Sequence, residues 1–213
     1  MLADRYQGHC LSSRNDVSRG EQGRLFFTDP RYGPRRGLEM ADEAVYRLDP
    51  DGTLTRVVGQ PDVEWPNGLA ITPDCTELYV VDSNHSVGGN CKIWAFTLDR
   101  DGSAVAWPLV YDPCQGRGGD GLELASGDNL HVCAGIMRPR TADETTDFPP
   151  GAYIITPGGQ LIEVIHIPQG VITNCCFGTA DLPTSFVTAG PTLFSTRVGA
   201  AGYHASVQPS AAI

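Results

Sequence analysis

Hydrophobic and polar positions follow the same order in four segments of this chain. Each segment opens on an asparagine or an aspartate, continues as a short apolar strand, turns on Gly, Asp or Pro, and returns as a second apolar strand. The opening residues are Asn15, Asn67, Asp120 and Asn174, which lie 52, 53 and 54 positions apart. A period of about 50 residues with the same kind of polar residue at each start indicates an internal repeat.

Further strands complete three of the four units. Third strands are expected at 44–48, 92–96, 152–155 and 192–195, and fourth strands at 54–58, 105–110 and 161–165. Turns rich in Gly and Asp link the third strands to the fourth ones. Four antiparallel strands per unit predict an all-β chain built from β-propeller blades, in which the innermost strands line a central channel. The four opening residues are therefore expected to converge on one axis.

The pattern also sets the expected boundaries. We expect a single partial β-propeller domain over residues 1–198, with repeat units at about 9–60, 61–114, 115–168 and 169–198. The fourth unit lacks a fourth strand, because 199–213 is rich in Gly and Ala and is expected to be a flexible tail. Residues 1–8 look like the last strand of an earlier blade. About three complete blades and one incomplete blade are thus expected, with open edges that permit self-association.

Charge and composition exclude several classes of function. The chain has 25 acidic and 15 basic residues, a net charge of −10, and Lys92 is its single lysine. Without a basic stripe or a GxxxxGK[ST] motif, a nucleic-acid partner and a P-loop nucleotide site are excluded. There is neither a signal peptide nor an apolar span of 18 residues, so we expect no membrane partner and a cytoplasmic location. The seven cysteines form no CxxC pair, which favours free thiols.

The opening residues of the repeats carry the candidate chemistry. Asn67 and Asp120 offer amide and carboxylate oxygens at equivalent positions of neighbouring blades, and a hard cation such as calcium binds six to eight such oxygens. The alternative is that each belongs to a turn dipeptide, Asn-Gly or Asp-Gly, and the residues alone leave both interpretations open. No HxH, HxxxH or GxSxG motif occurs, which argues against a histidine-zinc site and a serine hydrolase. Trp65, close to Asn67, is interpreted as packing between blades and not as a surface for sugar stacking.

Eight short motifs occur in a fixed order along the chain. Together they resemble the gluconolactonase / senescence-marker-protein / luciferin-regenerating-enzyme family of six-bladed β-propellers, and the resemblance extends from Leu2 to about Val198. The motifs are LADRYQG at 2–8, ND at 15–16, FTDPRYG at 27–33, VYRLDPDG at 45–52, PNGLA at 66–70, LYVVD at 78–82, GDGL at 119–122 and TNCCFG at 173–178.

The resemblance implies a divalent-metal site on the channel axis, usually occupied by calcium, with zinc, magnesium or manganese as alternatives. Asn67 and Asp120 match two of the family's metal ligands, whereas the third ligand, a glutamate of the first blade, has no counterpart in this sequence. Asn15 matches an asparagine that the family uses near the substrate. Asn174, at the equivalent position of the fourth unit, is a further candidate for substrate binding, and Arg14 either contacts substrate or faces solvent.

The function implied by the resemblance is hydrolysis of a sugar lactone or a related small cyclic ester. In this interpretation Asp120 is the catalytic residue, both metal ligand and general base toward a water molecule. The alternative is a truncated, non-catalytic propeller fragment that acts at most as a weak ligand- or partner-binding module. The missing glutamate and the open blades favour this alternative, and they predict weak or absent lactonase activity and association through the edges at 2–6 and 192–195.

Overall fold

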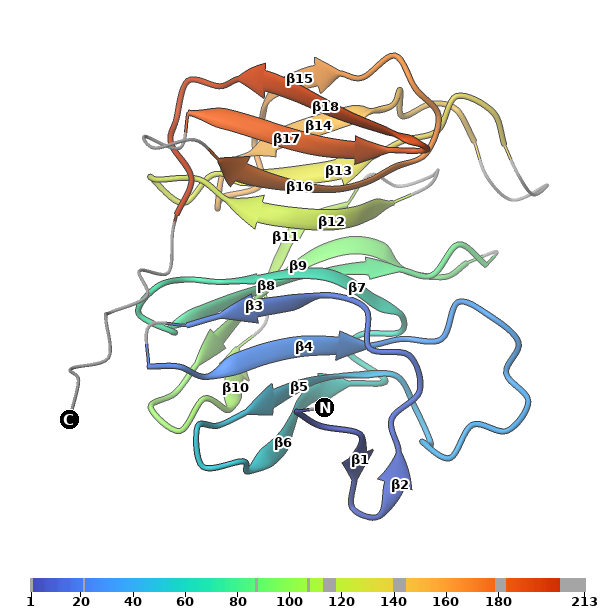
Figure 1. Cartoon of the computed structure of the whole chain (residues 1–213), viewed down its shortest axis with the longest axis vertical. Helices are drawn as coiled ribbons and strands as arrows, with labels where there is room; N and C mark the ends of the chain where they lie inside the picture. The colour runs from blue at the N-terminus through green and yellow to red at the C-terminus, as the bar shows by residue number, and fades with distance from the viewer. Residues whose placement is uncertain are drawn as a thin grey trace.

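All the regular elements of the described chain are β-strands. The computed structural model describes residues 2–20, 22–86, 88–106, 108–112, 118–139, 145–178 and 183–203. Four antiparallel sheets follow one another through the molecule, and a separate hairpin lies beside the first (Figure 1). No helix among the described residues is long and apolar enough to cross a membrane.

Each of the four sheets is one propeller blade, and its strands pair in chain order except at the end of blade 2. Blade 1 contains β3 (Val17–Arg19), β4 (Leu25–Asp29), β5 (Ala44–Leu48) and β6 (Leu54–Gly59). Blade 2 contains β7 (Pro66–Ile71), β8 (Glu77–Ser83), β9 (Cys91–Leu98), β10 (Ala104–Ala106) and β11 (Leu109–Tyr111). Blade 3 contains β12 (Gly119–Leu124), β13 (Leu130–Ala134), β14 (Gly151–Ile155) and β15 (Leu161–His166), and blade 4 contains β16 (Ile172–Gly178), β17 (Thr184–Ala189) and β18 (Thr192–Arg197).

The prediction of an all-β propeller arrangement with three complete blades and one incomplete blade is confirmed for the described residues. One detail differs, because the expected fourth strand at 105–110 is divided into β10 and β11. Both pieces pair with β9, and each pairing contains a register shift. Of the expected tail at 199–213, residues 204–213 lie outside the described residues, and Gly202 bridges to Ala125 of blade 3.

The N-terminal segment differs from the expectation of a strand left over from an earlier blade. β1 (Arg5–Tyr6) and β2 (His9–Cys10) form their own hairpin, and its turn residues Gln7 and Gly8 both have positive φ. The hairpin rests on blade 1, because the rings of Tyr6 and Tyr46 meet edge to face with centroids 5.1 Å apart. The turn and this aromatic contact explain why the segment folds back.

Alternation along the strands divides each blade into two apolar faces. In blade 1, Phe26 and Val45 pack with residues of blade 2, whereas Phe27 and Tyr46 pack on the opposite face with Leu11. Equivalent clusters lie between blades 2 and 3 and between blades 3 and 4. A period of two places neighbouring residues of a strand on opposite faces, so each central blade is buried on both sides.

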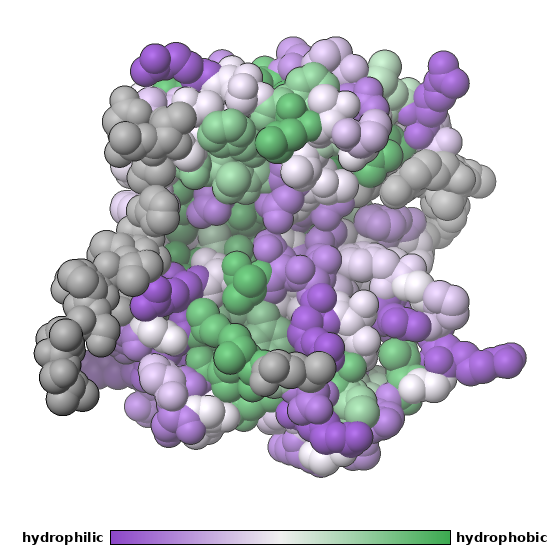
Figure 2. All heavy atoms as spheres, viewed as in Figure 1, coloured by the Kyte–Doolittle hydropathy of each residue, from purple (hydrophilic) through white to green (hydrophobic). Residues whose placement is uncertain are grey.

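The outward face of blade 1 leaves apolar side chains in contact with solvent. Leu2 and Val17 are 80% and 60% exposed, and they line an open groove of about 260 Å³ with Leu25 and Phe27. Figure 2 shows hydrophobic side chains gathered over the strands of this blade. The groove also reaches Asn15, so the beginning of the first repeat is open to solvent.

Candidate functional site

The structure brings the opening residues of the repeats to the start of four neighbouring innermost strands. Asn15 precedes β3, Asn67 lies in β7, Asp120 in β12 and Asn174 in β16. The amide Nδ2 of Asn15 donates a hydrogen bond to Oδ1 of Asn67 over 2.6 Å. This bond joins blades 1 and 2 across the inner edge of the sheets.

A second polar link connects blades 2 and 3. Asn67 Nδ2 donates to Ser83 Oγ at 3.4 Å, and the Ser83 hydroxyl donates a short hydrogen bond to the carbonyl oxygen of Gly119. Gly119 directly precedes Asp120 in β12, so the chain of contacts runs from Asn15 to the backbone beside Asp120. Asn67 is only 5% exposed and its orientation is fixed by these partners.

Asp16 lies at the centre of this arrangement, although the sequence analysis did not select it. One carboxylate oxygen accepts a hydrogen bond from the Leu69 backbone N–H at 3.1 Å, and the side chain interacts with both Asp120 and Asn174. Burial raises the pKa of the Asp16 carboxyl, the backbone hydrogen bonds oppose this change, and the nearby Asp120 carboxylate adds to it. Two carboxylates and three carboxamides therefore converge from four blades.

The innermost strands approach closely because the residue after the opening Asn67 or Asp120 is glycine in blades 2 and 3. A Cβ atom on Gly68 would lie 2.7 Å from Gly121 Cα and 2.8 Å from Leu122 N. A Cβ on Gly121 would lie 2.9 Å from Asn174 Cα and would overlap the Asn174 carboxamide. The glycines of the two dipeptides thus serve close packing of the innermost strands, and Asp16 stands at the same position in blade 1.

Two buried carboxylates hold the loops that lead into the site. Asp29, at the end of β4, accepts backbone N–H groups from Ser12 and Ser13, both at 2.7 Å. Asp82, near the end of β8, accepts them from Glu64 at 2.9 Å and Trp65 at 2.8 Å. Burial raises the pKa of Asp82 to about 6 in spite of these hydrogen bonds. These paired hydrogen bonds fix the backbone of the two loops, one leading to Asn15 in blade 1 and the other to Asn67 in blade 2.

Arg14 is placed away from the central amides. Its side chain is exposed, its Nη1 donates to the Leu11 carbonyl at 3.5 Å, and it lines the groove on blade 1. Its positive charge also acts on the nearby Asp29 carboxylate. The structure therefore places Arg14 at the rim, beside Asn15.

The donor chemistry of the site fits a hard divalent cation. The converging side chains offer only carboxylate and carboxamide oxygens, which are the ligand types that calcium prefers. Among the described residues, no group of three His, Cys, Asp or Glu side chains is arranged to hold a metal ion. The amide oxygens of Asn67 and Asn174 therefore have to supplement the carboxylates of Asp16 and Asp120.

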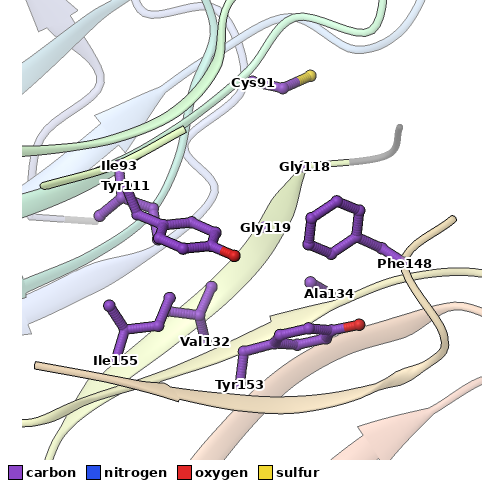
Figure 3. Close-up of a pocket in the computed structure, with 10 residues that line it drawn as sticks. All are labelled: Cys91, Ile93, Tyr111, Gly118, Gly119, Val132, Ala134, Phe148, Tyr153 and Ile155. Carbon is purple, nitrogen blue, oxygen red and sulfur yellow. The ribbon is translucent and has the colours of Figure 1, made fainter. Parts of the chain in front are cut away.

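A separate apolar pocket lies between blades 2 and 3 (Figure 3). Ile93 and Tyr111 line it from blade 2, and Val132 and Tyr153 from blade 3. The cavity has a volume of about 20 Å³, which is room for one water molecule. Gly119, in the innermost strand that carries Asp120, also lines the pocket. None of the described residues that line the pocket carries a carboxylate or an imidazole, so we place the candidate chemistry at the amide and carboxylate cluster instead.

Comparison with known proteins gives gluconolactonases among the relatives of this chain. The chain is 31% identical to a gluconolactonase of Zymomonas mobilis over 213 residues, covering 92% of this chain and 53% of that protein. The structure is similar to a gluconolactonase from Xanthomonas campestris, with a TM-score of 0.74, 32% identity, and coverage of 92% of this chain and 60% of the other. The fold is also shared by the calcium-binding protein regucalcin from Agrobacterium tumefaciens, with a TM-score of 0.67, 17% identity, and coverage of 89% and 62%.

The chain spans about half the length of the curated relatives that it matches. The family model described as SMP-30/Gluconolactonase/LRE-like region matches residues 1–190, which is most of the sequence. The repeated inner-strand motif, the propeller blades and this match agree, and the chain belongs to the SMP-30/gluconolactonase/LRE-like family.

Proposed function

We propose that this chain carries part of a metal-dependent sugar lactonase. The observation that carries the proposal is the convergence of Asn15, Asn67 and Asp16 with Asp120 at the inner edges of the blades. The gluconolactonases among the relatives support the reaction class. The substrate is a sugar lactone or a related small cyclic ester, which has one electrophilic carbonyl and several hydroxyl groups.

Asn67 and Asp120 would hold the divalent cation, for which calcium is the first candidate, because they supply amide and carboxylate oxygens from equivalent positions of neighbouring inner strands. The calcium-binding relative with the same fold supports this choice. When bound, such a cation polarises the lactone carbonyl and stabilises the negative charge that develops on its oxygen. The carboxylates at the site attract a cation in any case, since Asp16 and Asp120 repel one another without one.

The chain's own residues position the water and the substrate. Asp120 accepts the proton of the attacking water as a general base, a role that contributes about 10²–10⁴-fold to rates in other enzymes. Asn15 and Asn174 offer amide groups to the hydroxyls of the sugar, and Arg14 contacts the part of the substrate that extends toward the rim. Asn15 is preorganised for this role by its hydrogen bond to Asn67.

The test is the hydrolysis of gluconolactone by the 213-residue chain, followed through acid release and corrected for the spontaneous reaction. Turnover should disappear after chelation and return with calcium, and Asn67→Ala should require a much higher calcium concentration. Glu163→Gln, which changes an exposed carboxylate on β15, is the matched control and should behave as the wild type. Turnover that is the same with chelator and in Asn67→Ala would reject the proposal, and so would the absence of any turnover.

A further inference from the structure

Three aromatic side chains from separate segments meet beside the candidate site. Tyr32 belongs to the loop after β4, Trp65 lies two residues before Asn67, and His85 follows Ser83 by two residues. The ring centroids of Tyr32 and Trp65 are 5.9 Å apart, those of Trp65 and His85 6.0 Å, and those of Tyr32 and His85 6.1 Å. We call these three residues the aromatic cluster.

The aromatic cluster lies at the same end of the blades as the amide and carboxylate groups. Ser83 N donates to the Trp65 carbonyl at 3.0 Å, so the end of β8 and the start of β7 are adjacent there. Ser83 also contacts Asn67 through its hydroxyl. The buried side chains of Ser83 and Asn67 therefore connect the aromatic cluster to the amide and carboxylate groups of the candidate site.

The surroundings hold the aromatic cluster in place. The Tyr32 hydroxyl donates to the Trp65 carbonyl at 3.3 Å, and the Trp65 backbone N–H is fixed by the buried Asp82. The Glu64 carboxylate accepts hydrogen bonds from Asn84 Nδ2 and Asn90 N, both at 2.8 Å, which shapes the loop that carries His85. Glu64 thus has a structural role, and the rings are positioned before any ligand arrives.

Two rings of the aromatic cluster remain partly open to solvent. Tyr32 remains 43% exposed, Trp65 is partly exposed, and neither belongs to the hydrophobic core clusters of the described residues. The guanidinium of Arg35 lies 5.9 Å from the centre of the Trp65 ring and is paired with the buried Glu43 carboxylate, so its charge is already compensated. The contacts of Trp65 with Tyr32 and Arg35 of blade 1 agree with the interpretation of packing between blades, and the rest of its partly exposed ring is open to a ligand.

Preorganised aromatic faces beside hydrogen-bonding amides suit a ligand that is apolar on one face and polar at its edge. A pyranose ring has this form, because its C–H groups face an aromatic ring while its hydroxyls point outward to polar partners. We propose that Tyr32 and Trp65, whose rings stand at 84° to each other, form a corner in which the sugar ring of the substrate stacks against an aromatic face, with His85 supporting them. This inference rests on the proposed function, from which it takes the kind of ligand. It adds the residues that select an uncharged sugar ring.

The test uses anhydroglucitol, a pyranose without a carbonyl, which binds as a sugar ring but cannot be hydrolysed. The indole N–H resonance of Trp65 is followed by NMR during the titration of the isotope-labelled 213-residue chain, and Trp65→Phe assigns it. This resonance should shift, while that of Trp94, which lies over Lys92 in blade 2, should not. An unmoved Trp65 resonance up to the highest sugar concentration would overturn the proposal.

Variants of Tyr32 measure the contribution of the stacking surface. Tyr32→Ala should weaken sugar binding by about three- to tenfold, the effect of losing one aromatic contact, whereas Tyr32→Phe should stay within about twofold. Tyr203→Ala is the matched control, because Tyr203 is also exposed (37%) but bonds to Asp128 in a turn of blade 3. Equal affinity in Tyr32→Ala and wild type would overturn the proposal.

Hydrolysis separates this inference from the proposed function. If gluconolactone is not hydrolysed but the Trp65 resonance still shifts and depends on Tyr32, the lactonase proposal fails and the sugar site stands. If hydrolysis is metal-dependent but Tyr32→Ala leaves KM unchanged, the lactonase proposal stands and the stacking surface is overturned.

Discussion

Glu123 provides a quantitative test of how blades 3 and 4 pack. Its carboxyl group is partly buried on β12, where it accepts the Leu124 backbone N–H at 3.3 Å. Its charge acts on the thiols of Cys175 and Cys176 in β16, it pairs in register with His131 of β13, and the charge of Asp16 acts on it. Burial raises the pKa of Glu123 to about 7 from its ordinary value of 4.5.

The sign of the stability change follows from proton binding. Between pH 4.5 and 7 the folded chain keeps the Glu123 proton while the unfolded chain releases it, so this group lowers the free energy of unfolding as pH rises. The difference between a pKa of 4.5 in the unfolded chain and about 7 in the folded chain corresponds to about 3 kcal/mol. Above pH 7 the free energy of unfolding is lowered by this full amount. Glu123→Gln keeps the shape and the acceptor for Leu124 but removes the charge.

Urea unfolding at several pH values measures this effect as the difference between the variant and the wild type. The two proteins should have similar stability near pH 4.5, and Glu123→Gln should be more stable by up to about 3 kcal/mol at pH 8. Burial lowers the pKa of His131 to about 4, so its own contribution rises with pH up to about 6.5, but it is common to both proteins and cancels in the difference. A constant difference across this range, or one as small as that of Glu163→Gln, would refute the packing of Glu123 described above.

Three further predictions concern the inner strands and the open face. Gly68→Ala should lower the free energy of unfolding by about 1–3 kcal/mol in urea denaturation, because its Cβ has no space beside Gly121; an unchanged midpoint would mean that the strands are farther apart. Calorimetric titration should show that Asp120→Ala binds calcium at least about tenfold more weakly than the wild type, and identical isotherms would exclude Asp120 as a ligand. We expect the apolar groove of blade 1 to support self-association, so Val17→Asp should shift the chain toward the monomer in light scattering; a wild type that is monomeric at all concentrations would contradict this.

The repeat in the sequence was sufficient to predict the arrangement of the blades. The spacing of Asn15, Asn67, Asp120 and Asn174 places them at equivalent positions, and the hydrogen bond from Asn15 to Asn67 joins two neighbours of that series. Local turn signals could not predict the β1–β2 hairpin, because the contact between Tyr6 and Tyr46 that holds it is long-range. The functional roles of the four residues remain predictions.

Other features of the site depend on contacts that no single motif contains. Asp16 sits next to Asn15 in the sequence, but its importance appears only when its carboxylate is found on the Leu69 N–H of the next blade. Its alignment with Gly68 in the repeat was a usable signal, since a carboxylate there replaces a residue without a side chain. Tyr32 and Trp65 are 33 positions apart, and only the folded chain brings them together.

The most direct test of the account is the effect of Asp120→Asn on gluconolactone hydrolysis in the presence of saturating calcium. The amide keeps an oxygen for the metal but cannot accept the proton of water, so kcat should fall by about 10²–10⁴-fold with little change in KM. Glu163→Gln, measured in parallel, should retain the wild-type rate. A wild-type chain whose calcium-dependent turnover is undiminished by Asp120→Asn would contradict the central claim that Asp120 is the catalytic base of this site.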